Sequence, residues 1–514
     1  MTVPEPSPLV RGGVVLAVDQ GTTNTKAMLV DADTGAVVAD ASGPVGMRYP
    51  APGWVEQDAG EIWAATLTAI DACLARVPGA RVVGVGISNQ RESVVCWSRS
   101  TGEPLGPALG WQDARTSEWC EALAAAEPTA ARVVRARTGL ALDPMFSAPK
   151  FRAVIDAARS GGASTADIAV GTVDSWLIWK LTGRHLTDLG NASRTLLLDL
   201  ESLAWHEDLL RIFGVDRQHL PEVCPSDADF GTTSGGHGRL PAGVPVVAVL
   251  ADSHAALYHH GCTTPGTGKA TYGTGSSVMS PTADFRTAPD GIATTVAWHI
   301  GGQATYAREG NIVATGSALD WMATTLGAPA DIAGGAFLTD LAQRVTDNGG
   351  VHFVPAFSGL GAPHWDRSAT GLITGVTAGT TPAHLALAAL EAVAHQVADV
   401  VAAMEEDDAA PIQVLHADGG ATASRLLMQV QADLLQRPVE VARSPTASAL
   451  GVSTLVAHRL GVAPPPPVGG ERIVPRATDA SAARRSWARA VARSRGIPLP
   501  PPHLQSDEAI ERNI

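Results

Sequence analysis

Apolar runs that end in polar or glycine-rich turns recur along this chain. The first run, VVLAVD at residues 14–19, is apolar up to its final aspartate, which is typical of a buried strand. A polar turn at 20–26 and a second apolar run at 27–30 follow. This pattern predicts two antiparallel strands around a Gly-Thr-Thr turn, whose backbone N–H groups and hydroxyls can face a phosphate.

Two further apolar runs end in charged residues. VVGVGIS at 82–88 leads into a polar segment that contains Arg91 and Glu92, and VPVVAVLAD at 244–252 ends in Asp252. Ligand groups gather at the carboxyl ends of buried strands in α/β folds. The spacing alone also allows a surface ion pair at the first site and a helix cap at Asp252.

The second half of the chain repeats this theme. KATYGTGSS at 269–277 reads as a strand and a glycine turn, and IQVLHADGG at 412–420 as a strand followed by a helix, with Thr422 as a candidate cap. The repetition predicts a duplicated architecture, in which two α/β halves face each other across a cleft.

Helix start signals are clear at two places. Asp58 and Glu61 have the spacing of a capping box, which predicts a helix to about residue 74. Thr381 before Pro382 predicts the start of an alanine-rich helix that runs to Met404. Near the C-terminus, a basic helix at about 480–495 is expected on the surface, and the last residues are expected to be disordered.

The bulk composition limits the function classes. A chain of 514 residues exceeds a single ordinary core, and its net charge of −14 argues against nucleic acid or an anionic membrane as the main partner. No stretch approaches the roughly 20 apolar residues of a membrane span, and MTVPEPSPLVRGG lacks a signal-peptide core. Five cysteines without a C-x-x-C pair favour a reduced, cytoplasmic protein.

The run Gly266-Thr267-Gly268-Lys269 imitates a P-loop. The strict pattern G-x-x-x-x-G-K-[S/T] would place its first glycine at Thr263 and its hydroxyl at Ala270, so two fixed positions fail. We therefore expect the phosphate chemistry to lie elsewhere.

Taken together, these turns resemble the FGGY carbohydrate kinases, most closely the glycerol kinases among them. The resemblance runs from about Val14 to Arg495 and includes nine segments in the same order. These segments are DQGTTNTKA, YPAPGWVEQDAGEIW, NQRES, GWQDART, GTVDSWLIWKLTG, NASRTLLLDL, YGTGSS, VPAFSGLGAPHWD and ADGGATASRLLMQ. It implies an α/β fold of two actin-like (RNase-H-like) domains with an interdomain cleft. The implied boundaries are 13–259, 260–463, and a C-terminal linker, helix and tail at 464–514.

The resemblance also implies a reaction, namely transfer of the γ-phosphoryl group of ATP, with Mg²⁺, to a terminal hydroxyl of a small polyol. Asp252 matches the catalytic base and Asp19 the residue that holds magnesium. Arg91 and Glu92 match the pair that binds the polyol hydroxyls, and Trp111 the wall along the carbon chain. The nucleotide-binding positions that it implies are Gly21, Thr22, Thr23, Asn24, Lys26, Thr274, Gly275, Gly316, Asp320, Gly420 and Ser424. A homo-oligomer, dimer or tetramer, is implied as well, and Lys269 is expected to be a bystander on a strand edge.

The substrate pocket departs from the glycerol kinase pattern. Met145 replaces a tyrosine, Ser277 an aromatic residue, and Ser253 and His254 replace glutamines; Ala153 replaces a tryptophan. Exchanging two aromatic side chains for Met and Ser opens volume and removes a phenol donor, which changes selectivity among polyols. Glycerol, a longer polyol and a ketose all stay open as substrates.

The nucleotide side departs from the pattern too. Lys26 stands where glycerol kinases usually have arginine, Asp320 where they have glutamine, and Ser424 where they have asparagine. These exchanges resemble the pentulose kinase branch of the family. They are expected to alter ribose or adenine contacts more than the chemistry.

Overall fold

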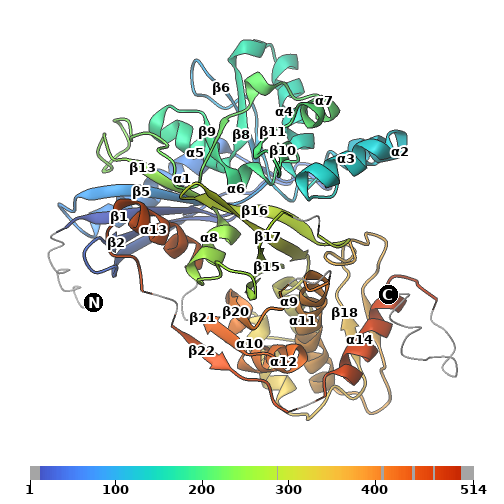
Figure 1. Ribbon diagram of the computed structural model, residues 1–514. Helices are drawn as coiled ribbons and strands as arrows, with labels where there is room; N and C mark the ends of the chain where they lie inside the picture. The colour runs from blue at the N-terminus through green and yellow to red at the C-terminus, as the bar shows by residue number, and fades with distance from the viewer. Residues whose placement is uncertain are drawn as a thin grey trace.

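The computed structural model describes residues 12–285, 288–406, 410–442, 446–466, 469–477 and 479–498 (Figure 1). Two central sheets organise it, one in each half of the chain. The first sheet has the order β3-β2-β1-β5-β13. Its strands are β3 (Val37–Pro44), β2 (Asn24–Asp31), β1 (Val14–Gln20), β5 (Val82–Asn89) and β13 (Val246–Ala251).

The second sheet repeats the first and extends it. Its order is β16-β17-β15-β14-β20-β21-β22. The strands are β16 (Ala293–Ile300), β17 (Gln303–Ile312), β15 (Ser276–Thr282), β14 (Thr267–Tyr272), β20 (Val414–Asp418), β21 (Val439–Ala442) and β22 (Gly470–Ile473). In each sheet three neighbouring strands pair antiparallel, β1-β2-β3 in the first and β14-β15-β17 in the second, and β1 and β14 also pair in parallel with β5 and β20. The predicted duplication and α/β fold are confirmed.

The remaining elements surround these sheets. A four-stranded sheet and three two-stranded ladders contain β4 (Glu56–Gln57), β6 (Val94–Ser98), β7 (Ala108–Leu109), β8 (Ile168–Thr172), β9 (Leu186–Asp188), β10 (Leu198–Asp199), β11 (Ala204–Trp205), β12 (Glu222–Cys224), β18 (His352–Val354) and β19 (Leu372–Thr374). The helices are α1 (Ala59–Ala75), α2 (Ser117–Ala126), α3 (Pro128–Thr138), α4 (Ser147–Ser160), α5 (Val173–Thr182), α6 (Leu189–Ala192), α7 (Glu207–Phe213), α8 (Asp252–His259), α9 (Gly316–Thr325), α10 (Gly334–Ala342), α11 (Pro382–Met404), α12 (Arg425–Leu435), α13 (Ala447–Leu460) and α14 (Ser481–Ser494).

Strand β1 is apolar from Val14 to Val18 because both of its faces are covered. Leu16 and Val18 pack in the same core cluster as residues of α1, whereas Val15 and Ala17 pack in the cluster that contains α13 residues. This alternation is the period of two that a strand imposes on its side chains.

Helix α13 comes late in the chain but packs against β1, β5 and β13 of the first sheet and against α8. Gly451 makes the approach to α8 possible, since a Cβ atom there would lie only 1.8 Å from the carbonyl oxygen of Ala255. The domain boundary between residues 259 and 260 stays a prediction. Helix α13 follows this boundary in the sequence but packs on the sheet of the first half.

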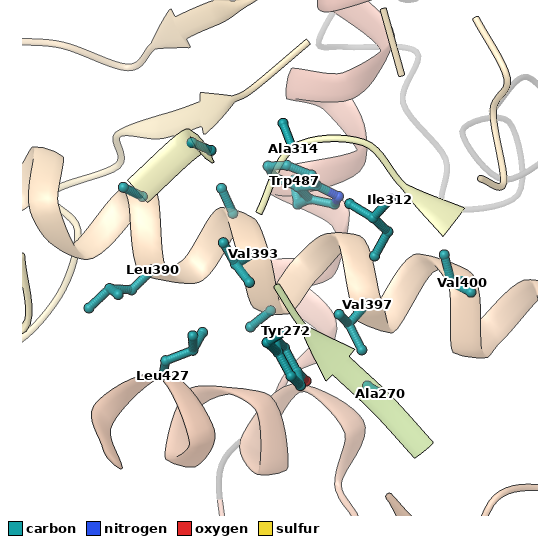
Figure 2. Close-up of a cluster of buried hydrophobic side chains, with 14 of the residues drawn as sticks. Ala270, Tyr272, Ile312, Ala314, Leu390, Val393, Val397, Val400, Leu427 and Trp487 are labelled. Atoms are coloured by element: carbon teal, nitrogen blue, oxygen red, sulfur yellow. The ribbon is translucent and has the colours of Figure 1, made fainter. Parts of the chain in front are cut away.

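Helix α11 forms the centre of the second core. Figure 2 shows Val393 and Val397 of this helix facing Tyr272 of β14 and Leu427 of α12. By length and hydropathy α11 could cross a membrane, contrary to the prediction that no stretch comes close, but 78% of its apolar window is buried inside the protein. It is therefore a core helix.

Helix α14 contributes Trp487 to this core, as Figure 2 shows, and Ala490 and Val491 are buried beside it. The prediction of a basic surface helix is confirmed, since Ser481, Arg485 and Arg493 are exposed, and the opposite face buries the apolar stripe of the helix. The tail beyond residue 498 lies outside the described residues.

The predicted helix caps are confirmed in part. Thr381 caps α11, and the Asp58 carboxylate accepts from two backbone N–H groups at the start of α1. Glu61 does not complete a capping box, since it pairs with Arg48 at 2.7 Å instead. The Thr422 cap is wrong, because Ser424 accepts from the backbone N–H of Leu427 and caps α12.

A continuous seam, formed by β16 and β17 against the first half, joins the two halves (Figure 1). The hydroxyls of Ser193 and Thr295 lie 2.7 Å apart, and the Tyr306 hydroxyl donates to the Leu200 carbonyl oxygen at 2.8 Å. The backbone N–H of Thr294 donates to the Gly139 carbonyl oxygen at 3.0 Å. The edge of the second sheet is therefore held in place by contacts along its length.

The contact between α13 and α8 leads to the first prediction. Gly451→Ala places a methyl group against the backbone of α8, and overpacking of this kind costs about 1–3 kcal/mol. We expect thermal unfolding to show a fall in Tm of several degrees. Gly43→Ala is the matched control, since its Cβ atom meets nothing within 4 Å. An unchanged Tm for Gly451→Ala would contradict the close approach.

Candidate active site

Two carboxylates meet at one edge of the first sheet. Asp19 lies near the end of β1, and Asp252 starts α8 directly after β13; both strands flank β5 and run parallel to it. Parallel strands place their carboxyl ends at the same edge, which explains why residues so distant in sequence lie close together.

The electrostatics of the pair follow from this proximity. Burial, and then the charge of Asp252, raise the pKa of Asp19 to about 6, although the hydroxyl of Ser88 donates to Asp19 at 3.0 Å. Burial also raises the pKa of Asp252, while the nearby Arg91 opposes the shift. Asp252 keeps 34% of its side chain exposed, so a substrate hydroxyl can reach it.

Arg91 and Glu92 belong to a buried cluster of four charges, here called the charge box, with Arg194 and Glu309. Both terminal nitrogens of Arg91 pair with the Glu309 carboxylate, at 2.8 and 2.6 Å. Arg194 donates from Nε to Glu92 at 2.6 Å, and its Nη1 lies 2.8 Å from Glu309. Asp252 adjoins the box, with its Oδ1 3.6 Å from Arg91 Nε.

The charge box is neutral in sum and almost wholly buried. Burial disfavours the charge of Arg91, but Glu309 and then Glu92 outweigh it and raise its pKa. Burial likewise opposes the charge of Glu309, and Arg194 and Arg91 outweigh it and lower the pKa of that carboxyl. Arg91 and Glu309 are therefore ionised, and the charge box offers fixed donors and acceptors beside Asp252.

Trp111 is hydrogen-bonded to the Gly21–Asn24 turn, the candidate phosphate-binding turn. The Trp111 indole nitrogen donates to the Thr22 hydroxyl at 3.1 Å, and Gln57 donates to the Thr22 carbonyl oxygen at 2.8 Å. The backbone N–H of Gly21 donates to the Asn24 carbonyl oxygen at 2.9 Å and closes the turn between β1 and β2. The loop is held from outside, while Thr23 and Asn24 stay exposed.

Lys150 fixes the two segments that carry Trp111 and Met145. Its Nζ donates to the carbonyl oxygens of Gly110 at 3.2 Å and of Met145 at 2.6 Å. Burial lowers the pKa of Lys150 to about 8, while the carboxylates of Glu92 and others oppose the shift. Met145 itself is half-buried and packs at the margin of a core cluster.

The predicted nucleotide residues of the second half lie at a turn and at helix starts. The β14–β15 turn presents Thr274 and Gly275, and the N–H of Gly316 at the start of α9 donates to the Gly273 carbonyl oxygen at 2.9 Å. A Cβ atom on Gly275 would meet the Ile312 carbonyl oxygen at 2.4 Å, so only glycine fits there. Helix starts of this kind suit phosphate groups.

Ser424, Gly420 and Asp320 complete this set. The Ser424 hydroxyl lies 2.7 Å from that of Thr339 in α10, and Gly420 is exposed with open space where a Cβ atom would stand. Asp320 is exposed on α9 beside Gly334, the first residue of α10. The candidate nucleotide-binding residues of the second half make these contacts within that half. Asp19, Thr22 and the candidate carbohydrate-binding residues lie in the first half.

Both halves of the chain match a known family. The N-terminal domain of the FGGY family of carbohydrate kinases matches residues 14–258, and the C-terminal domain of that family matches residues 268–460. The chain belongs to the FGGY family of carbohydrate kinases. The resemblance inferred from its motifs is thereby confirmed.

Relatives and solved structures agree on this family. An apulose kinase of Pectobacterium atrosepticum is 47% identical, over 87% of this chain and 90% of its own length. A glycerol kinase of Thermus brockianus is 44% identical over 94% and 98%. The crystal structure of Plasmodium falciparum glycerol kinase with ADP superposes with a TM-score of 0.85 at 27% identity, covering 94% of this chain and 98% of that one. A xylulose kinase from Rhodospirillum rubrum follows with 0.82 at 28%, covering 93% and 98%.

Lys269 differs from its prediction. Strand β14 lies between β15 and β20, so this FGGY kinase carries Lys269 in the middle of its second sheet and fully buried, not on an edge. Its Nζ donates to the Thr271 hydroxyl at 2.7 Å. Burial lowers the pKa of Lys269, and the charge of Asp418 is the largest of the effects that oppose this shift.

The residues present fit a magnesium ion. Burial, and then the charge of Asp252, raise the pKa of Asp19, so a cation at this edge would stabilise the ionised carboxylates. Magnesium prefers oxygen ligands and usually takes one or two carboxylates together with phosphates and water. Within the described part of the chain, no group of three or more His, Cys, Asp or Glu residues could hold a metal, so most ligands would come from ATP and water.

Sequence reasoning missed two residues of the charge box, Arg194 and Glu309. Arg194 lies in the NASRTLLLDL segment, and Glu309 lies in β17, which offers no turn or strand-end signal. Polar residues flank both positions, so the local pattern did not mark either residue as buried.

Proposed function

We propose that this FGGY kinase transfers the γ-phosphoryl group of ATP to a terminal hydroxyl of a small polyol, with glycerol as the first candidate. The observation that carries the proposal is the position of Asp252. It stands 3.6 Å from Arg91 of the charge box and shares the sheet edge with Asp19 and the Gly21–Asn24 turn. A base, a hydroxyl-binding pair and a phosphate turn thus converge.

The residues divide the work of the reaction. Arg91 donates to one substrate hydroxyl and Glu92 accepts from its neighbour, which orients the carbon chain along Trp111. Asp252 accepts the proton of the terminal hydroxyl as that oxygen attacks the γ-phosphorus. The bond between this phosphorus and the terminal oxygen of ADP breaks, and ADP departs. Bound Mg²⁺, with Asp19 among its ligands, would neutralise phosphate charge.

The nucleotide is assigned to the second half. Thr274, Gly275 and Gly316 would border the phosphates, and Gly420 and Ser424 the ribose and adenine, because small residues at turns allow close approach. Asp320 would stand at the edge of that site. Thr22, Thr23, Asn24 and Lys26 would face the phosphates from the first half. A cytoplasmic homo-oligomer belongs to the same proposal.

A larger carbohydrate is the second candidate, and the residue types at three positions favour it. Met145 and Ser277 leave more room than two aromatic side chains, and Ser253 presents a short hydroxyl beside the base. The apulose kinase at 47% identity and the xylulose kinase structure fit a ketose. Both candidates use the same base and the same phosphate turn.

A substrate panel tests the proposal. We expect ADP release with ATP and Mg²⁺ when glycerol, erythritol, threitol, xylitol, ribitol, dihydroxyacetone, xylulose or apulose is offered at saturation. A kcat/KM preference for glycerol supports the first candidate, and a preference for a four- or five-carbon substrate supports the second. Absence of turnover with every compound would refute the kinase proposal.

The role of Asp252 is tested by Asp252→Asn. The amide cannot accept the hydroxyl proton, so kcat is expected to fall by at least about 10²-fold. ATP affinity, measured by calorimetry, is expected to stay near the wild-type value, because the base lies at the carbohydrate end of the cleft. Unchanged kcat would show that another group accepts the proton.

The pocket size is tested by Met145→Tyr combined with Ser277→Phe. The two aromatic side chains fill the space and restore a phenol donor, so the kcat/KM ratio of glycerol to five-carbon substrates is expected to rise by about 10-fold or more. The same substrate panel measures the ratio. A ratio that does not move would mean that these positions do not border the substrate.

A further inference from the structure

Glu309 stands out among the buried residues that carry no role in the proposed reaction. Its side chain is fully buried, and it comes from β17 of the second sheet, 218 positions after Arg91. It is nevertheless the acid that binds both terminal nitrogens of Arg91. A bidentate pair of this kind fixes the plane and the direction of a guanidinium group.

Three partners hold the Glu309 carboxylate in turn. Besides Arg91, it accepts the Ser277 hydroxyl at 3.1 Å and lies 2.8 Å from Arg194 Nη1. Ser277 is the residue that replaces an aromatic side chain of the glycerol kinase pattern. In this chain its hydroxyl thus supports Glu309, in addition to leaving room in the pocket.

The balance of buried positive and negative charges explains why the first half needs Glu309. Without Glu309, Arg91 and Arg194 would share only Glu92 and the more distant Asp252. An unpaired buried charge is costly, so the guanidinium groups would turn toward Asp252 or toward water. With Glu309 in place, the Nε group of Arg91 remains directed toward Asp252 and Glu92, at 3.6 and 4.0 Å.

The seam supports this arrangement close to Glu309. Strands β16 and β17 are hydrogen-bonded to the first half on the N-terminal side of Glu309 in β17, through Thr295 to Ser193 and through Tyr306 to Leu200. We propose that Glu309 is a positioning residue for the carbohydrate substrate: it crosses from the second sheet and, beside the fully buried Arg194, holds Arg91 in the orientation that binds the substrate hydroxyls. This inference rests on the proposed function of the same site.

The test is Glu309→Gln, which keeps the size of the side chain and removes its charge. The KM for the preferred carbohydrate is expected to rise by at least about 10-fold, because Arg91 loses its bidentate partner. The KM for ATP is expected to stay within about twofold, since the nucleotide set lies elsewhere. Glu207→Gln is the matched control, because it removes an exposed carboxylate 3.2 Å from Arg217; its two KM values should equal those of the wild type.

Three outcomes would overturn the inference. The first is a folded Glu309→Gln enzyme with the wild-type KM for carbohydrate. The second is an equal rise in both KM values together with a lower Tm, which would mark a merely structural role. If Glu309→Gln does not fold, Ser277→Ala decides: it keeps both ion pairs and removes one hydrogen bond to Glu309, and an unchanged KM for carbohydrate would contradict the proposal.

Calorimetry with carbohydrate in the absence of ATP separates this inference from the proposed function. Wild-type protein that binds no member of the substrate panel and turns none over refutes the proposed function and the inference with it. Wild-type protein that turns over a carbohydrate, beside a Glu309→Gln variant of equal affinity, refutes the role of Glu309 alone.

Discussion

The burial of two guanidinium groups between two carboxylates is the constraint on which the active site depends. Arg91 and Arg194 lose most of their hydration, and only close, well-oriented carboxylates offset that cost. Glu92 supplies one from the first half and Glu309 the other from the second. The charge box is complete only when β17 lies against the first half, so the seam between the halves belongs to the site as much as its side chains do.

The carbohydrate and the phosphates of the nucleotide need different kinds of contact. In the proposed reaction, the hydroxyls of a carbohydrate need donors and acceptors at fixed angles, which Arg91 and Glu92 of the charge box would supply. The phosphates need N–H groups, hydroxyls and room for close approach, for which the turns at Gly21 and Gly275 and the helix start at Gly316 are the candidates. Asp252 would lie at the carbohydrate end, beside the terminal hydroxyl, and Asp19 beside the phosphates.

Helix α8, which begins with Asp252, is held in place by segments from both halves of the chain. Both halves repeat one sheet order, yet α13 from late in the chain packs on the first sheet and against α8. Gly451 brings α13 against the backbone of α8, whose first residue is Asp252. The candidate base is therefore positioned by its own strand and by a helix from the far end of the sequence.

The sequence by itself determined whatever depends on neighbouring residues. Apolar runs marked β1, β5, β13 and β20, and the polar residues at their ends marked Asp19, Arg91 and Asp252, because strand burial and strand ends are local properties. The ordered motifs identified the family. Only the tertiary structure decided the partners of those residues: Glu309 and Arg194 in the charge box, the central place of Lys269 and the cap at Ser424. Contacts between distant segments follow from how sheets and helices pack, and no spacing along the chain encodes them.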